Sequence, residues 1–241
     1  SNKDGHQGEN GLNNINLLLF RGSPRSNIEN VEMWNDKLPC DKLIIRFTSE
    51  YKAYKRAREF FMEHKEYTHL VIATDDIVVQ PKHIELMQMR LENKDPPVFS
   101  GMMNVNQNDV EDRNICHTIG MKERRLRKYE WIKKSDITER YMNVEFAGFG
   151  LTAIRRDIVD GYPIFSADKV FQGEPPHRGA SLDFVFCWHC KENGIPIAVD
   201  TKIDMKHLRK SGTHRVNTKA GRCEWWKMGK EPIQLPRQGL D

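Results

Sequence analysis

The sequence has no apolar run that approaches the roughly eighteen residues needed to span a bilayer. The first residues, Ser1 to Gly11, are polar and lack the apolar core of a signal peptide. We therefore expect residues 1–14 to form a disordered lead-in, and the protein to be cytoplasmic. The five cysteines are odd in number and scattered, which predicts free thiols in a reducing compartment rather than a disulfide framework. No internal repeat is apparent.

A large net charge is also absent. The formal charge of +4 is too small by itself to indicate nucleic-acid binding. The basic residues are nevertheless concentrated in two segments. Residues 122–134 contain seven Lys/Arg and two Glu, and residues 201–230 contain nine Lys/Arg and two acidic residues. Each segment could be an ordinary solvated face or part of a site for phosphate groups.

The length of 241 residues suits one large domain or one domain with an appended arm. Short apolar runs alternate with amphipathic segments in the first half of the chain. Strands are expected at residues 16–20, 42–47, 70–73 and 98–105, and helices at 50–64 and from Pro81 onward. Residues 106–136 are polar and predicted to be rich in loops. This alternation predicts an α/β fold with a mostly parallel central sheet flanked by helices.

Two adjacent carboxylates, Asp75 and Asp76, follow the apolar run that ends at Thr74. Adjacent acids repel each other beside an apolar sheet unless a cation offsets them. Hard oxygen ligands at a strand end suit Mg²⁺ or Mn²⁺, and ligands bind at that edge of open α/β sheets. Alternatively, the pair caps a turn before the helix that begins near Pro81.

Three further features follow in order along the chain. Residues 148–150, Gly-Phe-Gly, interrupt an apolar segment and would permit close backbone approach to a ligand. Asp183 begins an apolar helix that ends at Asn193-Gly194, and His207 follows the next strand. Asp183 could instead be a helix cap, and His207 could be a histidine bonded to backbone.

This ordered set resembles the GT-A nucleotide-sugar glycosyltransferases, in particular the family 2 group. Thr74-Asp75-Asp76-Ile77 occupies the place of the D-x-D signature, the glycine segment leads into Arg155-Arg156, and Asp183 occupies the acidic helix start. Thr74 and Leu182 each replace an acid of the family pattern. The resemblance implies a single GT-A-like, Rossmann-like domain over residues 15–208. A basic C-terminal arm, residues 209–241, would pack on the site or close over it.

The resemblance also implies roles for individual residues. Asp76, Asp75 and His207 would hold Mn²⁺ or Mg²⁺ against a UDP- or GDP-linked sugar. The acceptor would be a glycan or another hydroxyl compound, lying against Gly148, Phe149 and Gly150. Asp183 would be the general base of an inverting transfer, with its pKa lowered by the helix N-terminus. Donor contacts would come from Arg56, Thr74, Lys206, Arg209, Lys210, His214 and Arg215.

The sequence leaves other functions open. A nucleotidyltransferase would need a phosphate loop after the first strand, for which residues 20–25 are a candidate. Thr74 and Leu182 suggest a degenerate relative that binds nucleotide or glycan without turnover. A nucleic-acid binder lacks any recognition motif here, so no nucleic-acid partner is expected. Cys187 and Cys190 lie within a predicted helix, which favours buried thiols over a zinc or redox site.

Overall fold

The computed structural model describes residues 16–22, 38–46, 48–74, 76–93, 96–106, 109–123, 125–162, 181–208 and 221–240. The strands are β1 (Asn16–Gly22), β2 (Asp41–Arg46), β3 (His69–Thr74), β4 (Ile77–Val78), β5 (Val98–Asn106), β6 (Asp109–Arg113), β7 (Ile115–Cys116), β8 (Ile119–Lys122), β9 (Arg125–Tyr129), β10 (Tyr141–Val144), β11 (Phe146–Ala147), β12 (Leu151–Arg155), β13 (Ile197–His207), β14 (Arg222–Trp226) and β15 (Ile233–Gln234). The helices are α2 (Glu50–Glu63), α3 (Pro81–Asn93), α4 (Arg156–Gly161), α5 (Leu182–Glu192) and a 3₁₀ turn, η1 (Lys134–Asp136).

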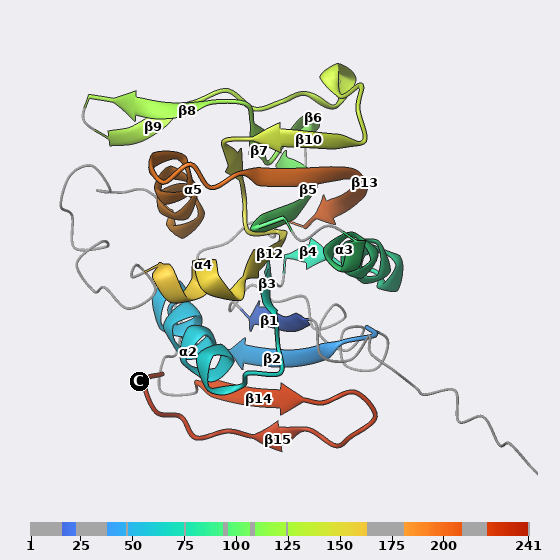
Figure 1. Cartoon of the computed structure of the whole chain (residues 1–241), viewed down its shortest axis with the longest axis vertical. Coiled ribbons are helices and arrows are strands. Elements are labelled where there is room, and N and C mark those ends of the chain that lie inside the picture. Colours follow the sequence, from blue (N-terminus) through green and yellow to red (C-terminus); the bar gives the residue numbers. More distant parts are fainter. Residues whose placement is uncertain are drawn as a thin grey trace, which may run out of the picture.

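The main sheet has the strand order β10-β13-β5-β12-β3-β1-β2-β14-β15, with β4 and β6 paired to β13 and β5 outside that path. Among the described strands, the parallel pairs are β1 with β2, β1 with β3, and β5 with β13. The remaining pairs are antiparallel (Figure 1).

The prediction of a mostly parallel, Rossmann-like sheet is therefore wrong: the sheet is mixed and most of its pairings are antiparallel. The first half of the chain does alternate strands with helices. After β5, however, the chain continues through short strands without a crossover helix. It returns as β12, which inserts antiparallel between β3 and β5. A strand that returns without a helix over the sheet face need not run parallel to its neighbour.

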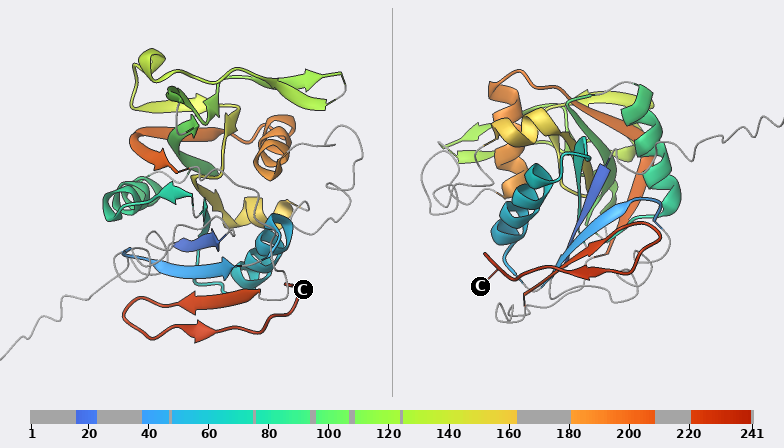
Figure 2. Two further views of the ribbon diagram at one scale, coloured as in Figure 1. Left: turned by 180° about the vertical axis from the view of Figure 1, so that it is seen from behind. Right: turned by 60° about the horizontal axis from the view of Figure 1, so that its bottom comes forward.

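Helices cover both faces of the sheet, as Figure 2 shows. Buried residues of α2, α4 and α5 form one apolar cluster, and buried residues of α3 belong to the other. The helix predicted from residue 50 does begin there, and Ser49 caps it: the Ser49 hydroxyl accepts a hydrogen bond of 3.3 Å from the Lys52 amide. Asp183 lies in the first turn of α5, as predicted, and α5 ends before Asn193-Gly194.

The region predicted to be loop-rich, residues 106–136, instead contains β6 to β9. Strands β8 and β9 form a hairpin that projects beyond α5 at one end of the molecule (Figure 1). Its sequence is dominated by Lys and Arg rather than by an apolar alternation, which concealed the strands from pattern reasoning.

The described part of the C-terminal arm extends the sheet instead of covering the end of β3. Strand β14 pairs with β2, and β15 pairs with β14. A buried hydrogen-bond chain anchors it: Trp225 Nε1 donates to the Tyr67 hydroxyl over 3.2 Å, and that hydroxyl donates to Asp41 Oδ2 over 2.6 Å. The Met228 amide donates to the other oxygen of Asp41, at 2.9 Å.

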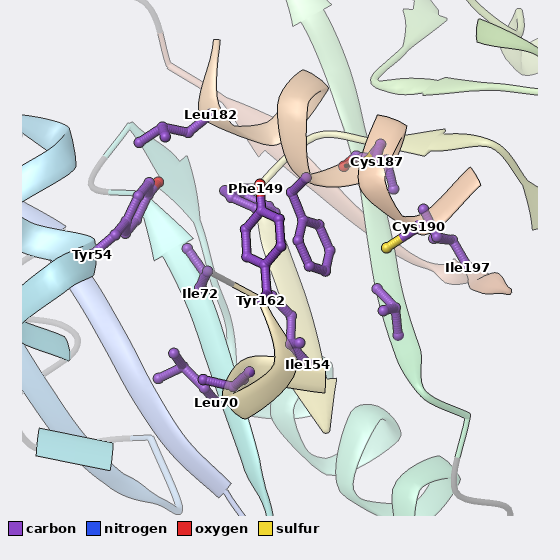
Figure 3. Packing of buried hydrophobic residues seen from close by; sticks show 14 of the residues in the cluster. Tyr54, Leu70, Ile72, Phe149, Ile154, Tyr162, Leu182, Cys187, Cys190 and Ile197 are labelled. Atoms are coloured by element: carbon purple, nitrogen blue, oxygen red, sulfur yellow. Dashed lines mark hydrogen bonds between the residues drawn. The ribbon is translucent and has the colours of Figure 1, made fainter. Parts of the chain in front are cut away.

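Within the part of the chain that the structure describes, no helix combines the length and apolar character required to cross a membrane. The five cysteines are free, as the sequence predicted, and all five are buried; Cys187 and Cys190 point into the core from α5 (Figure 3).

Candidate functional site

Asp76 and His207 face each other where β3 and β13 end. His207 Nε2 lies 3.1 Å from Asp76 Oδ2. Two segments bring them together: β4 immediately follows Asp76, and His207 is paired with Ile77 of β4 in antiparallel register. The Leu208 amide also donates to the Asp76 carbonyl over 2.6 Å. Residues more than a hundred positions apart thus form one compact pair.

The His207 ring is held in one tautomer by the backbone of β5. Its Nδ1 lies 3.1 Å from the Asn104 carbonyl oxygen and 2.9 Å from the Val105 carbonyl oxygen. Carbonyl oxygens only accept hydrogen bonds, so Nδ1 carries a proton. In a neutral imidazole Nε2 then presents a lone pair toward Asp76. A lone pair facing a carboxylate oxygen is repulsive unless a proton or a cation lies between them.

Thr74 orients Asp76. Its hydroxyl donates a 2.6 Å hydrogen bond to Asp76 Oδ1, leaving Oδ2 turned toward His207. Thr74 therefore acts on the carboxylate two positions later in the chain. Asp75, the other acid of the pair, lies outside the described residues.

The glycine segment lies between this pair and Asp183. A Cβ added to Gly150 would lie 3.4 Å from Ile77 Cδ1 and 2.8 Å from Met103 Sδ. A Cβ added to Gly148 would lie 3.4 Å from Asp183 Oδ2 and 3.3 Å from Asn114 Nδ2. The segment therefore approaches β4 at one end and the Asp183 carboxylate at the other, and side chains at either glycine would crowd these contacts.

Phe149, between the two glycines, does not face a ligand. Its side chain is buried and packs edge-on against Tyr54 and obliquely against Phe186, with ring centroids 5.7 and 5.6 Å apart (Figure 3). Only its backbone can contribute to the acceptor contacts that the resemblance implied. The ring instead fixes the segment to the core, which holds Gly148 and Gly150 in place.

Asp183 is half-buried, and its carboxylate receives two local hydrogen bonds. The Ser181 hydroxyl donates to Oδ1, and the Phe184 amide donates to the same oxygen over 2.8 Å. Burial nevertheless raises the pKa of the Asp183 carboxyl above its ordinary value, and the nearby Glu50 adds to this rise. The sequence led us to expect a lowered pKa, so the direction is reversed. A raised pKa makes Asp183 a stronger base than predicted.

A pocket of about 580 Å³ opens beside His207. Lys206, Arg113 and Lys134 contribute cations to its wall, and Asp204 pairs with two of them, at 3.3 Å from Arg113 Nε and 3.4 Å from Lys134 Nζ. Lys206, which was predicted to contact the donor, is exposed on β13 at this wall. Glu111 also lines the pocket, so its three cationic and two anionic side chains leave a net charge of +1 next to the Asp76–His207 pair.

Arg56 was also predicted to contact the donor. It lies on α2, and its side chain contacts the Cys223 thiol of β14, at the edge of the sheet that the arm extends. Arg209, Lys210, His214 and Arg215 lie outside the described residues, as do residues 23–25, the second half of the candidate phosphate loop.

Two asparagines at the site were not predicted. The Asn104 side-chain oxygen accepts a 2.9 Å hydrogen bond from the His207 amide, while its backbone oxygen faces the ring. The Asn114 side chain accepts from the Met103 amide at 2.8 Å and donates to the Gly148 carbonyl at 3.1 Å. Neither asparagine belongs to a motif, and their partners are remote in sequence, so no local signal could have identified them.

Comparisons with known proteins do not assign a family. No protein-family model matches the chain, and no curated protein matches it in sequence. Among solved structures it is similar to the crystal structure of A197 from STIV, with a TM-score of 0.49 and 14% identity over 84% of this chain and 98% of that one. We draw no functional conclusion from so distant a similarity.

Proposed function

We propose that the protein is a metal-dependent glycosyltransferase. It transfers a sugar from a UDP- or GDP-linked donor to a hydroxyl group, with inversion at the anomeric carbon. Support comes from the ordered motifs of the sequence and from the spatial series that links Asp76, His207, Gly148 and Asp183.

One observation carries the proposal: the Asp76 carboxylate and the His207 Nε2 atom face each other at 3.1 Å, while Nδ1 is committed to backbone carbonyls. Metal-ligating histidines commonly donate their other ring N–H to a backbone carbonyl in this way. The backbone thus prepares Nε2 as an acceptor atom directed at a carboxylate. A cation between the two groups would remove their repulsion.

The donor set suits a hard divalent cation that is completed by the substrate. Within the described residues, no group of three or more His, Cys, Asp and Glu side chains converges on one point. Mg²⁺ commonly takes only one or two protein ligands and fills its other positions with water and substrate phosphates. Asp76 and His207 would hold Mn²⁺ or Mg²⁺ in this manner, and the bound cation would supply positive charge for the diphosphate leaving group.

Asp183 is suited to activate the acceptor. Its carboxylate would take the proton of the acceptor hydroxyl while that oxygen bonds to the anomeric carbon. The bond from that carbon to the diphosphate oxygen breaks, and the nucleoside diphosphate departs with the bonding electrons. A raised pKa brings a carboxylate closer to the strength that general-base catalysis at neutral pH requires. Because Gly148 has no side chain, it places no Cβ atom beside Asp183 Oδ2, where one would lie 3.4 Å away.

Lys206 and the pocket beside His207 are suited to the phosphate groups of the donor. Lys206 adjoins His207 on β13 and lines the same wall as Arg113 and Lys134. Cations on that wall would offset the negative charge that develops on the leaving diphosphate.

The direct test is to incubate the protein with Mn²⁺ and a panel of UDP- and GDP-sugars, and to measure release of the nucleoside diphosphate. We expect turnover with at least one donor and its loss in Asp76→Asn. Asp160→Asn is the matched control, because that aspartate is exposed on α4. It should leave turnover unchanged.

Three results would contradict the proposal. Pyrophosphate release from a nucleoside triphosphate and a sugar phosphate would identify a nucleotidyltransferase instead. Donor binding without hydrolysis or transfer would identify a non-catalytic relative. Unchanged metal-dependent turnover in Asp76→Asn would refute the assignment of the site.

A further inference from the structure

A cluster of four aromatic rings begins immediately beside Asp183. Phe184 of α5 stacks on Phe146 with ring centroids 4.1 Å apart, and Tyr129 lies 4.8 Å from Phe184. Trp131 completes the cluster, at 4.7 Å from Tyr129 and 5.5 Å from Phe146. Phe184 directly follows Asp183 in α5, and its amide donates to Asp183 Oδ1, so the cluster starts at the residue next to the candidate base.

The outer part of this cluster is accessible. Phe146 is fully buried, Trp131 and Phe184 are half-buried, and Tyr129 is 38% exposed. Exposed aromatic rings with one polar end are suited to ligands that are apolar on one face and polar at the rim. A sugar ring has such a character, since one face presents C–H groups and the rim presents hydroxyls. Phe146, on which Phe184 stacks, lies two residues before Gly148, whose added Cβ would contact Asp183 Oδ2, so the cluster lies near the candidate base.

The sequence around the cluster is basic. Residues 122–134, which include β9 and lead into η1, contain seven Lys/Arg and two Glu. Lys122 and Lys128 are exposed on the β8–β9 hairpin that bears Tyr129. A basic surface beside a stacking platform favours an anionic ligand.

We propose that the acceptor is an anionic sugar chain, one of whose rings stacks on Tyr129 and Phe184 while its carboxylates face the basic hairpin. This inference rests on the glycosyl transfer proposed above and specifies its acceptor. Single-stranded nucleic acid also combines stacking with basic side chains. It fits less well, because its phosphates would approach the Asp183 carboxylate, whereas a sugar brings a hydroxyl that can give up a proton there.

The probe is α-1,4-linked trigalacturonate, and its methyl ester is the uncharged control with the same rings. We expect calorimetry to detect binding of trigalacturonate and at least tenfold weaker binding of the ester. Tyr129→Ala should raise the dissociation constant of trigalacturonate, and its KM as acceptor, about tenfold. Tyr129→Phe, which keeps the ring, should restore both values. Tyr141→Ala is the matched control, since Tyr141 is 41% exposed on β10 and packs against Arg90 and Arg140.

The binding and transfer measurements separate this inference from the function on which it rests. If donor turnover occurs but Tyr129→Ala leaves the acceptor KM and the trigalacturonate affinity unchanged, the acceptor surface is wrong and the transferase stands. If no donor turns over, the transferase is wrong, and calorimetry with trigalacturonate still tests the binding surface. Binding of oligo-dT that depends on Tyr129 and is not displaced by trigalacturonate would overturn the inference.

Discussion

The proposed transfer activity should be sensitive to one small addition, a methyl group at Gly148. In Gly148→Ala the new Cβ would lie 3.4 Å from Asp183 Oδ2 and 3.3 to 3.5 Å from atoms of the Asn114 side chain. The contacts with Asp183 Oδ2 and Asn114 Cβ are ordinary van der Waals distances, and only the 3.3 Å contact with Asn114 Nδ2 is slightly tight. The substitution should therefore fold, and its methyl group would crowd the side of Asp183 at which the proposed transfer would place the acceptor hydroxyl.

Gly148→Ala should change the free energy of unfolding only slightly but lower kcat/KM strongly. Replacing glycine lowers the conformational entropy of the unfolded chain and stabilises by about 0.4–1 kcal/mol, while the tight contact costs a similar amount. We expect the free energy of unfolding to change by less than about 1 kcal/mol. Displacing a reacting group by about 1 Å costs on the order of 100-fold in rate, so kcat/KM should fall by roughly that factor.

Urea unfolding and donor-to-acceptor transfer kinetics measure these two effects separately. Gly161→Ala is the matched control, because a Cβ there would meet no atom within 4 Å. The predicted loss of activity is refuted if Gly148→Ala folds normally and retains the kcat/KM of the wild type. It is equally refuted if Gly161→Ala loses as much activity.

Three other predictions follow from the structure. Asp183→Asn should lower turnover on the order of 10²–10⁴-fold without lowering Tm. The pKa of Asp183 is higher in the folded than in the unfolded protein, so ionising this carboxyl lowers the folded-state stability as the pH rises above the unfolded pKa. The neutral amide of Asp183→Asn avoids that cost. The wild-type rate, in turn, should fall as the pH drops through the raised pKa. If the Tm of Asp183→Asn at neutral pH were well below that of the wild type, the prediction that this variant is not destabilised would be wrong. Tyr67→Phe removes the hydroxyl that links Trp225 to Asp41 and should cost about 2–4 kcal/mol in urea unfolding, whereas a loss below 0.5 kcal/mol would show that the arm is anchored elsewhere. The five cysteines should react with a thiol reagent only after unfolding, because burial raises the thiol pKa, to about 12 for Cys40; rapid reaction of native protein would contradict their burial.

The sequence anticipated local structure well where one segment determines its own conformation. The helix capped by Ser49 and the helix that begins at Leu182 both depend on signals within a few residues. The strand ending at Thr74 was equally evident from its apolar residues. Such features need no knowledge of distant partners.

Strand direction was not predictable in the same way. Whether β12 runs parallel or antiparallel to β3 depends on the path that the chain takes between them. That path consists of short strands in a polar, basic segment without a clear apolar alternation. The alternation of strands and helices in the first half of the chain suggested a parallel sheet, but the second half does not continue that alternation.

In the candidate site, too, features set by the local sequence were predictable and features set by distant contacts were not. Asp76, Asp183 and His207 could be selected because each stands at an element boundary, and the structure brings Asp76 and His207 within hydrogen-bond distance. The roles of Asn104 and Asn114 could not be predicted, since each depends on a contact across the sheet. The pKa of Asp183 was predicted in the wrong direction because burial, which depends on the fold, outweighs the effect of the helix N-terminus.

Binding of Mn²⁺, measured by electron paramagnetic resonance, tests the central claim most directly. The titration compares wild type, Asp76→Asn and the control Asp160→Asn, each with UDP or GDP present. The account predicts that wild type and Asp160→Asn bind Mn²⁺ alike, and that Asp76→Asn binds it on the order of tenfold or more weakly. Equal Mn²⁺ affinity in all three proteins, or no nucleotide-dependent binding in the wild type, would contradict it.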